Sequence, residues 1–229
     1  MSRALFITGT DTGVGKTVIT AGLAYLLRTR GYRVAAIKAI ETGWDGPPTA
    51  LPPDAALLAK ATGFKGESRN IVPVFYPEPV APAAAAARHN QAVPVHSILQ
   101  TYAQCQRDHD IVLVEGAGGL MVPISETLDM AGLAKEMDLP LLVIGRAGLG
   151  TLNHTGLTLH YSACMGLTVQ GVVLNFKHHR PSDISEESNA EWLTHQWKRP
   201  VWQVPRLSLP GIEQMAEALS SVDVIRLFD

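Results

Sequence analysis

Nine residues near the amino terminus have the composition of a phosphate-binding loop. Residues 9–17 read Gly-Thr-Asp-Thr-Gly-Val-Gly-Lys-Thr and separate an apolar run at 4–7 from a helix-like run at 18–30. A backbone that curls around phosphate oxygens needs glycine, because side chains would obstruct the approach. In such a loop Lys16 reaches the β- and γ-phosphates and the Thr17 hydroxyl binds Mg²⁺. The predicted ATP contacts are Asp11, Thr12, Gly13, Val14, Gly15, Lys16, Thr17 and Val18.

The match to the strict motif is incomplete at one position. The motif requires a glycine five residues before Gly15, where this chain has Thr10, although Gly9 lies just outside. An ordinary strand-to-helix turn is the alternative interpretation. Such a turn would not need two glycines, a lysine and a threonine together at a strand end, so nucleotide binding is favoured.

Charged residues also follow two other predicted strands. Lys38 ends the second strand, and a lysine leaving a buried strand is costly unless it meets an anion. Glu115 follows the apolar residues 111–114 and precedes glycine-rich residues 116–119, as does the Mg²⁺-holding acid of nucleotide hydrolases. Asp54 stands at the start of a helix-like segment, where capping is the favoured interpretation of this residue taken alone.

Together these residues predict chemistry on the γ-phosphoryl group of ATP. Thr17, Asp54 and Glu115 would supply oxygen ligands to Mg²⁺, which prefers a few carboxylates combined with water and phosphate. Lys16 and Lys38 would neutralise phosphoryl charge, and catalysis of this transfer rests mainly on positioning and charge stabilisation.

Alternating apolar and helix-like segments position these residues. We expect strands at 4–8, 33–39, 111–115, 141–145, 169–175 and 201–204. We expect helices at 16–30, 53–61, 95–107, 130–137, 152–165, 184–197 and 211–219. This alternation is typical of an α/β fold of the P-loop type, a doubly wound, mostly parallel sheet with helices on both faces. Ligands bind outside the carboxyl ends of the strands in such folds.

Length and charge restrict the class of protein. The 229 residues, 46% of them hydrophobic, can bury one core, so we expect a single domain over 1–229. A net charge of −2 gives no basic surface for nucleic acid or an anionic membrane. The expected partners are therefore small molecules.

The cysteines and the amino terminus predict a cytoplasmic protein. Cys105 and Cys164 both lie in helix-like apolar patterns, so we expect two buried, reduced thiols. Met-Ser-Arg leads directly into a strand without the apolar region of a signal peptide, and no apolar run approaches 18 residues.

The motifs, taken in order, resemble the dethiobiotin synthetase family. The resemblance rests on the loop at 9–17 and on later positions that extend to about residue 207. These positions are Lys38, Thr42-Gly43, Asp54, the run 115–119, the run 150–154 (Gly-Thr-Leu-Asn-His), Asn175 and Pro205.

The resemblance implies an ATP- and Mg²⁺-dependent ligase of biotin synthesis. The substrate, 7,8-diaminononanoate, takes up CO₂ as a carbamate, ATP phosphorylates the carbamate, and the second amine closes the cyclic urea. The resemblance assigns catalytic roles to Lys16, Lys38 and Thr12, and places Thr12, Lys38, Thr42 and Gly118 at the substrate.

The same resemblance assigns the remaining contacts. Asn175 and the segment Pro205, Arg206 and Leu207 would recognise adenine. Gly150, Thr151 and Asn153 would begin a helix whose free amides bind the distant carboxylate of the substrate. In the family that helix comes from the other subunit, so a homodimer with shared sites is implied.

The chain departs from the family at three places. Ala39 stands where the family usually has proline, and the histidine of a Pro-His pair is absent at 81–83. Glu41 is an extra acid near the expected diamine. It either attracts a substrate ammonium or is a solvated loop acid, and the second interpretation is favoured.

Two other functions remain as alternatives. A related P-loop ligase would act on another amine or carboxylate, as the amide-forming cobyrinate ligases do, but these usually carry a glutaminase domain for which this chain has no room. A ParA- or MinD-like switch ATPase would carry an extra signature lysine in the loop, where this chain has Asp11 and Thr12. It would also be expected to have a basic amphipathic tail, which is missing.

Overall fold

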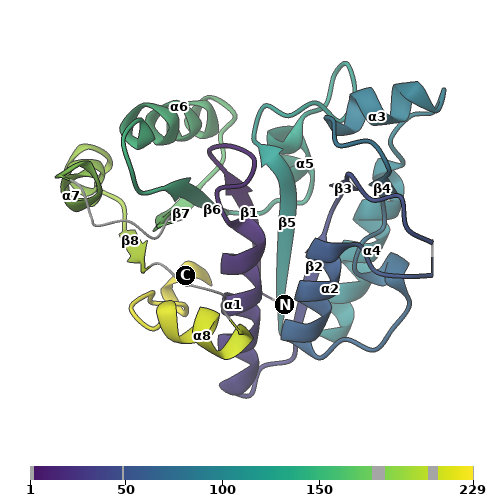
Figure 1. Ribbon diagram of the computed structural model, residues 1–229, viewed down its shortest axis with the longest axis horizontal. Coiled ribbons are helices and arrows are strands. Elements are labelled where there is room, and N and C mark those ends of the chain that lie inside the picture. Colours follow the sequence, from purple (N-terminus) through teal and green to yellow (C-terminus); the bar gives the residue numbers. More distant parts are fainter. Residues whose placement is uncertain (1–2, 48, 177–183, 206–210, 229) are drawn as a thin grey trace.

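Six parallel strands form the central sheet in the computed structural model, which describes residues 3–47, 49–176, 184–205 and 211–228 (Figure 1). The strand order is β2-β5-β1-β6-β7-β8, and each neighbouring pair is parallel. The strands are β1 (Arg3–Gly9), β2 (Val34–Lys38), β5 (Ile111–Gly119), β6 (Leu141–Arg146), β7 (Val169–Asn175) and β8 (Val201–Val204).

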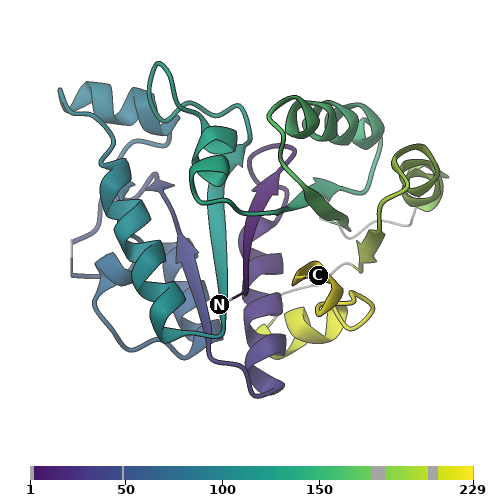
Figure 2. The ribbon, with the colours of Figure 1, turned by 180° about the vertical axis from the view of Figure 1, so that it is seen from behind.

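Helices cover both faces of this sheet, which confirms the predicted doubly wound fold. One face carries α1 (Lys16–Thr29), α2 (Pro53–Thr62) and α8 (Ile212–Ala218). The other carries α4 (Val95–Asp108), α5 (Met130–Glu136), α6 (Thr151–Cys164) and α7 (Ile184–Trp197), which Figure 2 shows from behind. Side chains of β1 alternate between the two cores, because Leu5 and Ile7 pack on the first face and Phe6 on the second.

Several short elements lie outside the regular alternation. They are β3 (Glu41–Thr42), β4 (Phe75–Tyr76), α3 (Pro82–Arg88) and two 3₁₀ turns, Ser68–Asn70 and Arg226–Phe228. The parallel pair β3-β4 was not predicted, because strands of two residues show no alternation that a sequence pattern can reveal. Its consequence is that the chain beyond Lys38 stays ordered next to the start of α2.

Strand β5 continues past the point where a glycine-rich turn was predicted. It runs on to Gly119, which pairs with Gly9 at the edge of the phosphate-binding loop. The glycines allow this extension, because a Cβ at Gly119 would lie 3.1 Å from the Gly9 carbonyl oxygen. A Cβ at Gly116 would similarly lie 2.9 Å from the Phe6 ring. Close contact with β1, and not a turn, is therefore what these glycines provide.

No helix in the described part of the chain is both long and apolar enough to cross a membrane. The cytoplasmic location and the single domain stay predictions.

The prediction of two buried thiols is wrong for one cysteine. Both cysteines are free, but only Cys105 is buried, whereas Cys164 is exposed at the end of α6. Burial, with a smaller effect of Asp108, raises the pKa of the Cys105 thiol to about 11. Because the thiolate is the reactive form, Cys105 has little of it at neutral pH.

The two thiols should therefore react at very different rates with iodoacetamide. At pH 7.5 we expect Cys164 to be alkylated rapidly and Cys105 to remain unmodified until the protein is unfolded. Peptide mass spectrometry after timed quenching measures both rates. In a Cys164→Ser variant the slow reaction of Cys105 can be measured by itself. Equal labelling of both thiols in the folded protein would contradict this burial.

Candidate active site

The phosphate-binding loop connects β1 to α1 at the carboxyl edge of the sheet. Gly15, the N-cap residue of α1, has φ 101°, and Gly13 has φ 70°, both in the left-handed region that favours glycine. The Asn175 side chain, at the end of β7, donates a hydrogen bond from Nδ2 to the Val14 carbonyl oxygen at 3.0 Å. A neighbouring strand therefore holds the loop from outside.

Asp11 organises the other side of the loop. Its Oδ1 accepts a hydrogen bond from the Thr12 N–H at 2.7 Å, and its carbonyl oxygen accepts one from Lys16 Nζ at 3.2 Å. Arg146, the last residue of β6, donates from Nη2 to Asp11 Oδ2 at 2.7 Å. The sequence reasoning missed Arg146, although a charged residue at the end of a buried strand is the signal that identified Lys38.

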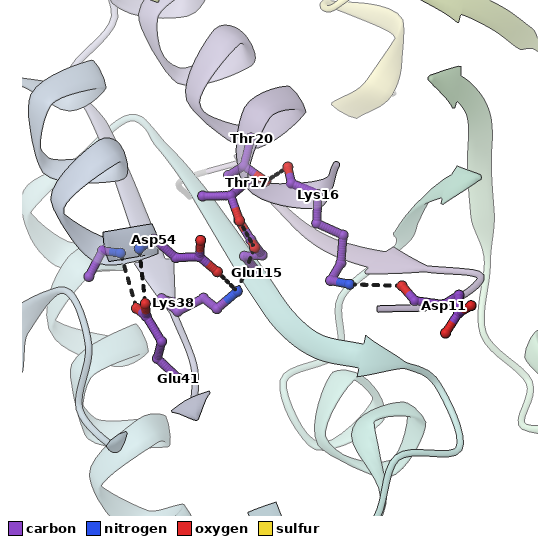
Figure 3. A network of polar contacts seen from close by, with 9 residues as sticks. Asp11, Lys16, Thr17, Thr20, Lys38, Glu41, Asp54 and Glu115 are labelled. Carbon is purple, nitrogen blue, oxygen red and sulfur yellow. Dashed lines mark hydrogen bonds and ion pairs between the residues drawn. The ribbon is translucent and has the colours of Figure 1, made fainter. Parts of the chain in front are cut away.

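A charge cluster, in which Lys38 and Glu115 are buried and Asp54 is partly exposed, lies beside the loop (Figure 3). The Lys38 ammonium lies between two carboxylates, 2.6 Å from Asp54 Oδ2 and 2.7 Å from Glu115 Oε1. The Thr17 hydroxyl donates to the same Glu115 oxygen at 2.7 Å. Residues from four elements, α1, β2, α2 and β5, therefore meet at one point, as expected for the ends of parallel strands.

The two lysines respond differently to burial. Burial, with a smaller contribution from the Lys38 charge, lowers the pKa of Lys16 to about 8, although Glu115 and Asp54 act to raise it. Burial also acts to lower the pKa of Lys38, but Glu115 and Asp54 outweigh it, so the net direction is upward. Lys38 is therefore cationic at neutral pH. A bound polyphosphate would stabilise the charged form of Lys16 and raise its pKa.

The donor set fits a hard cation such as Mg²⁺. Glu115 is fully buried, and its Oε2 has no hydrogen-bond partner among the described residues. No three His, Cys, Asp or Glu side chains gather around a metal position in the described ranges. A metal here would therefore bind through the Asp54 and Glu115 carboxylates, the Thr17 hydroxyl and ligand oxygens, which matches the habit of Mg²⁺.

Two local interpretations, Asp54 as a helix cap and Glu41 as a solvated acid, require correction. Asp54 does not cap α2, since its carboxylate is bound to Lys38. The cap comes from Glu41 in β3, whose Oε1 accepts the Asp54 N–H at 2.9 Å and whose Oε2 accepts the Ala55 N–H at 3.1 Å. Glu41 is only 6% exposed, so the favoured interpretation as a solvated loop acid is wrong.

A cavity of about 900 Å³ opens over the cluster. Its walls include most of the predicted nucleotide and substrate contacts. These are Thr12, Gly13, Gly15, Lys16, Thr17, Val18, Lys38, Thr42, Asp54, Gly118 and Asn175. Residues 79–82 form the opposite wall, next to Gly43, so the segment that lacks the family histidine also faces the cavity.

The other predicted contacts do not line this cavity. Val14 and Glu115 are buried, although Glu115 belongs to the charge cluster beneath the cavity, and Asp11 and Pro205 are exposed. Arg206 and Leu207 lie outside the described residues. Gly150, Thr151 and Asn153 are at the start of α6 and do not line this cavity.

The Thr151 side chain is turned into the protein. It is fully buried, and its hydroxyl shares a hydrogen bond of 3.2 Å with the Thr155 hydroxyl. Its amide donates to the Gly148 carbonyl oxygen at 3.2 Å. A ligand at the start of α6 would therefore have to bind through other amides of this turn.

Comparisons with known proteins agree with this geometry. A family model described as an AAA domain matches residues 3–214. The chain is 42% identical to the ATP-dependent dethiobiotin synthetase BioD of Aquifex aeolicus over 204 residues, 89% of each protein. It is 37% identical to the protein of the same name from Anaeromyxobacter dehalogenans over 222 residues, 96% of each.

A solved structure shows the same fold at much lower identity. The ParA family ATPase of Chlorobium tepidum aligns with a TM-score of 0.55 and 16% identity, covering 99% of this chain and 93% of that one. At this identity the likeness concerns the fold alone.

Proposed function

This chain belongs to the dethiobiotin synthetase family, and we propose that it closes the cyclic urea of dethiobiotin from 7,8-diaminononanoate and CO₂, converting ATP to ADP and phosphate. It is an ATP-dependent ligase of biotin synthesis. The observation that carries the proposal is the charge cluster of buried Lys38 and Glu115 with the partly exposed Asp54, beside a phosphate-binding loop. The relatives at 37% and 42% identity are named dethiobiotin synthetases. The alternative of a switch ATPase has only a shared fold at 16% identity.

The reaction proceeds through a carbamate and its phosphorylated form. One amine of the substrate attacks CO₂ and loses a proton, giving a carbamate. A carbamate oxygen then attacks the γ-phosphorus, and the bond from that phosphorus to ADP breaks. The second amine attacks the carbonyl carbon of the mixed anhydride, phosphate leaves with the bridging oxygen, and a proton is lost as the ring closes.

The lysines reduce the repulsion between a carbamate and a polyanionic nucleotide. Lys16 binds the β- and γ-phosphates, and Lys38 lies where the γ-phosphoryl group and the carbamate meet. Thr12, Thr42 and Gly118, on the cavity wall, contact the diamine or its carbamate. Thr17, Asp54 and Glu115 would hold Mg²⁺, which would supply positive charge to the phosphate oxygens.

In this proposal Asn175, which contacts the phosphate-binding loop at Val14, recognises adenine. Asn175 already uses its Nδ2 to hold the Val14 carbonyl, which leaves the amide oxygen to accept from an adenine amine. Pro205, Arg206 and Leu207 provide the second adenine contact in this proposal.

Phosphate release from Mg-ATP tests this function. The purified chain should release phosphate only when the diamine and bicarbonate are both present. Omission of either should return the rate to the background of ATP alone. Release that is indifferent to both would instead indicate a different substrate or a switch ATPase.

We also propose that the enzyme is a homodimer in which the start of α6 completes the site of the partner. Large apolar side chains are exposed around this end of α6, above all Leu149 with 87% exposure and Leu152 with 39%. Gly150, the N-cap residue of α6, lies between them in the sequence and has φ 92°. An apolar surface of this kind on a small enzyme is typical of a contact between subunits.

A charge at Leu149 should therefore separate the subunits. Leu149→Asp is expected to shift the mass measured by analytical ultracentrifugation from dimer to monomer and to raise the KM for the diamine. Thr29→Asp is the control, because Thr29 is exposed at the end of α1, on the face of the sheet opposite to α6. A Leu149→Asp protein that remains a dimer with unchanged KM would contradict the proposed contact.

A further inference from the structure

Glu41 is a buried acid that the reaction described above does not use. It lies in the two-residue strand β3, on the wall of the cavity, and is 6% exposed. Both carboxylate oxygens are occupied by backbone amides of α2, at 2.9 Å and 3.1 Å. Figure 3 shows this pair of contacts on the side of Asp54 that faces away from Glu115.

Helix α2 cannot cap itself. Its N-cap residue is Pro52 and its first residue is Pro53, and neither has a side chain that accepts a hydrogen bond. The amides of the next two residues, Asp54 and Ala55, would otherwise be left without an intrahelical partner. Glu41 satisfies both from a different element, and its negative charge lies at the positive end of the helix.

Asp54 links this helix cap to the active site. The amide that binds Glu41 Oε1 and the carboxylate that binds Lys38 belong to one residue, Asp54. Any movement of the first turn of α2 therefore moves the Asp54 carboxylate. The Asp54 side chain is 41% exposed, so packing restrains it only weakly, and its position depends on the ion pair with Lys38 and on the anchored backbone.

We propose that Glu41 is a positioning residue, which fixes the start of α2 so that the Asp54 carboxylate stays aimed at Lys38 and at the metal–nucleotide. The proposal rests on the proposed function only in taking Asp54 to be a metal ligand. It also explains why the short pair β3-β4 exists, since that pair holds Glu41 through the contact of Glu41 with Phe75.

A direct role in binding the substrate ammonium is the competing interpretation. An ammonium would have to share both oxygens with the helix amides, because each already accepts one hydrogen bond. A positioning role predicts weaker metal binding after substitution, whereas an ammonium site predicts a higher KM for the diamine alone. The two interpretations therefore separate experimentally.

Glu41→Gln tests the proposal, because the amide side chain keeps the shape but can accept through only one oxygen. The probe is Mn²⁺, which is spin-active and binds to Mg²⁺ sites, and it is added to the protein in complex with a non-hydrolysable ATP analogue. We expect its affinity to weaken by about three- to tenfold, which corresponds to the free energy of a lost helix cap. Electron paramagnetic resonance measures free Mn²⁺ directly. Hydrogen exchange at the Asp54 and Ala55 amides should accelerate in the metal-free protein.

Asp129→Asn provides a matched control. Asp129 caps α5 by accepting the Gly132 N–H through Oδ1 at 2.8 Å, and its Oδ2 accepts the Tyr161 hydroxyl, so its amide variant also keeps only one accepting oxygen, but outside the cavity wall. It should lower the melting temperature without changing Mn²⁺ affinity. If Glu41 had a purely structural role, Glu41→Gln would likewise lower the melting temperature and leave the Mn²⁺ affinity unchanged.

A double variant identifies the route of the effect. In the background of Asp54→Asn, which already weakens the metal site, adding Glu41→Gln should produce no further loss of Mn²⁺ affinity. Full additivity, unchanged Mn²⁺ affinity in Glu41→Gln, or a change confined to the KM for the diamine would each overturn the proposal. These binding and exchange measurements need no diamine, so they stand even if the synthetase reaction is not observed.

Discussion

A Lys38→Met protein is expected to unfold more easily by about 3–5 kcal/mol and to lose at least about 10²-fold in synthetase turnover. Lys38 and Glu115 are 5% and 0% exposed, and their charged atoms lie 2.7 Å apart. Methionine has a similar length and no charge. It therefore leaves the Glu115 carboxylate buried without its counter-charge, and it removes the cation proposed to lie between phosphate and carbamate.

Urea denaturation and turnover with Mg-ATP measure the two losses separately. In the double variant Lys38→Met/Glu115→Gln the buried charge is gone, so most of the stability should return while turnover remains lost. A single variant as stable as the unsubstituted protein would contradict the buried ion pair. Normal turnover in the double variant would show that neither Lys38 nor Glu115 takes part in the reaction.

The second large effect is expected from Gly15→Ala. A Cβ on Gly15 would lie 2.0 Å from Asn175 Nδ2, and φ 101° is strained for any residue with a side chain. Either the loop or Asn175 has to move, and both are proposed to contact ATP. We expect kcat/KM for ATP to fall by about a hundredfold, the size of effect that a small misplacement in an active site can produce.

Gly31→Ala separates backbone strain from this collision. Gly31 has φ 92°, and no described atom lies within 4 Å of a Cβ placed there. It should lose about 1–2 kcal/mol of stability and keep normal kinetics for ATP. If Gly15→Ala and Gly31→Ala have the same kinetics, then the contact between Asn175 and the loop does not matter for nucleotide binding.

The sheet was predictable because most of its strands are buried on both faces. A parallel strand covered by helices is rich in apolar residues, as residues 111–114 and 141–144 are. Residues 169–175 and 201–204 were also bounded correctly, although each contains a glutamine and only Val204 is buried in the edge strand β8. The phosphate-binding loop was equally clear, because its glycines and lysine serve a backbone geometry that few other structures require.

The partners of individual side chains were less predictable, because they depend on contacts across the fold. Asp54 has the local pattern of a helix cap, yet an ion pair with Lys38, 16 residues earlier, determines its role. Glu41 reaches α2 across a loop rich in glycine and proline, where no periodicity fixes the path. Cys164 was misjudged because α6 also exposes apolar side chains, such as Leu157, so its pattern resembles that of a core helix.

The most direct test of the central claim is the mass of the product formed from ¹³C-bicarbonate. The purified chain would be supplied with Mg-ATP, 7,8-diaminononanoate and the labelled bicarbonate, and the products analysed by mass spectrometry. The account predicts dethiobiotin that carries one ¹³C in its urea ring, formed in equal amount to ADP. ADP formed without any labelled cyclic urea would contradict it.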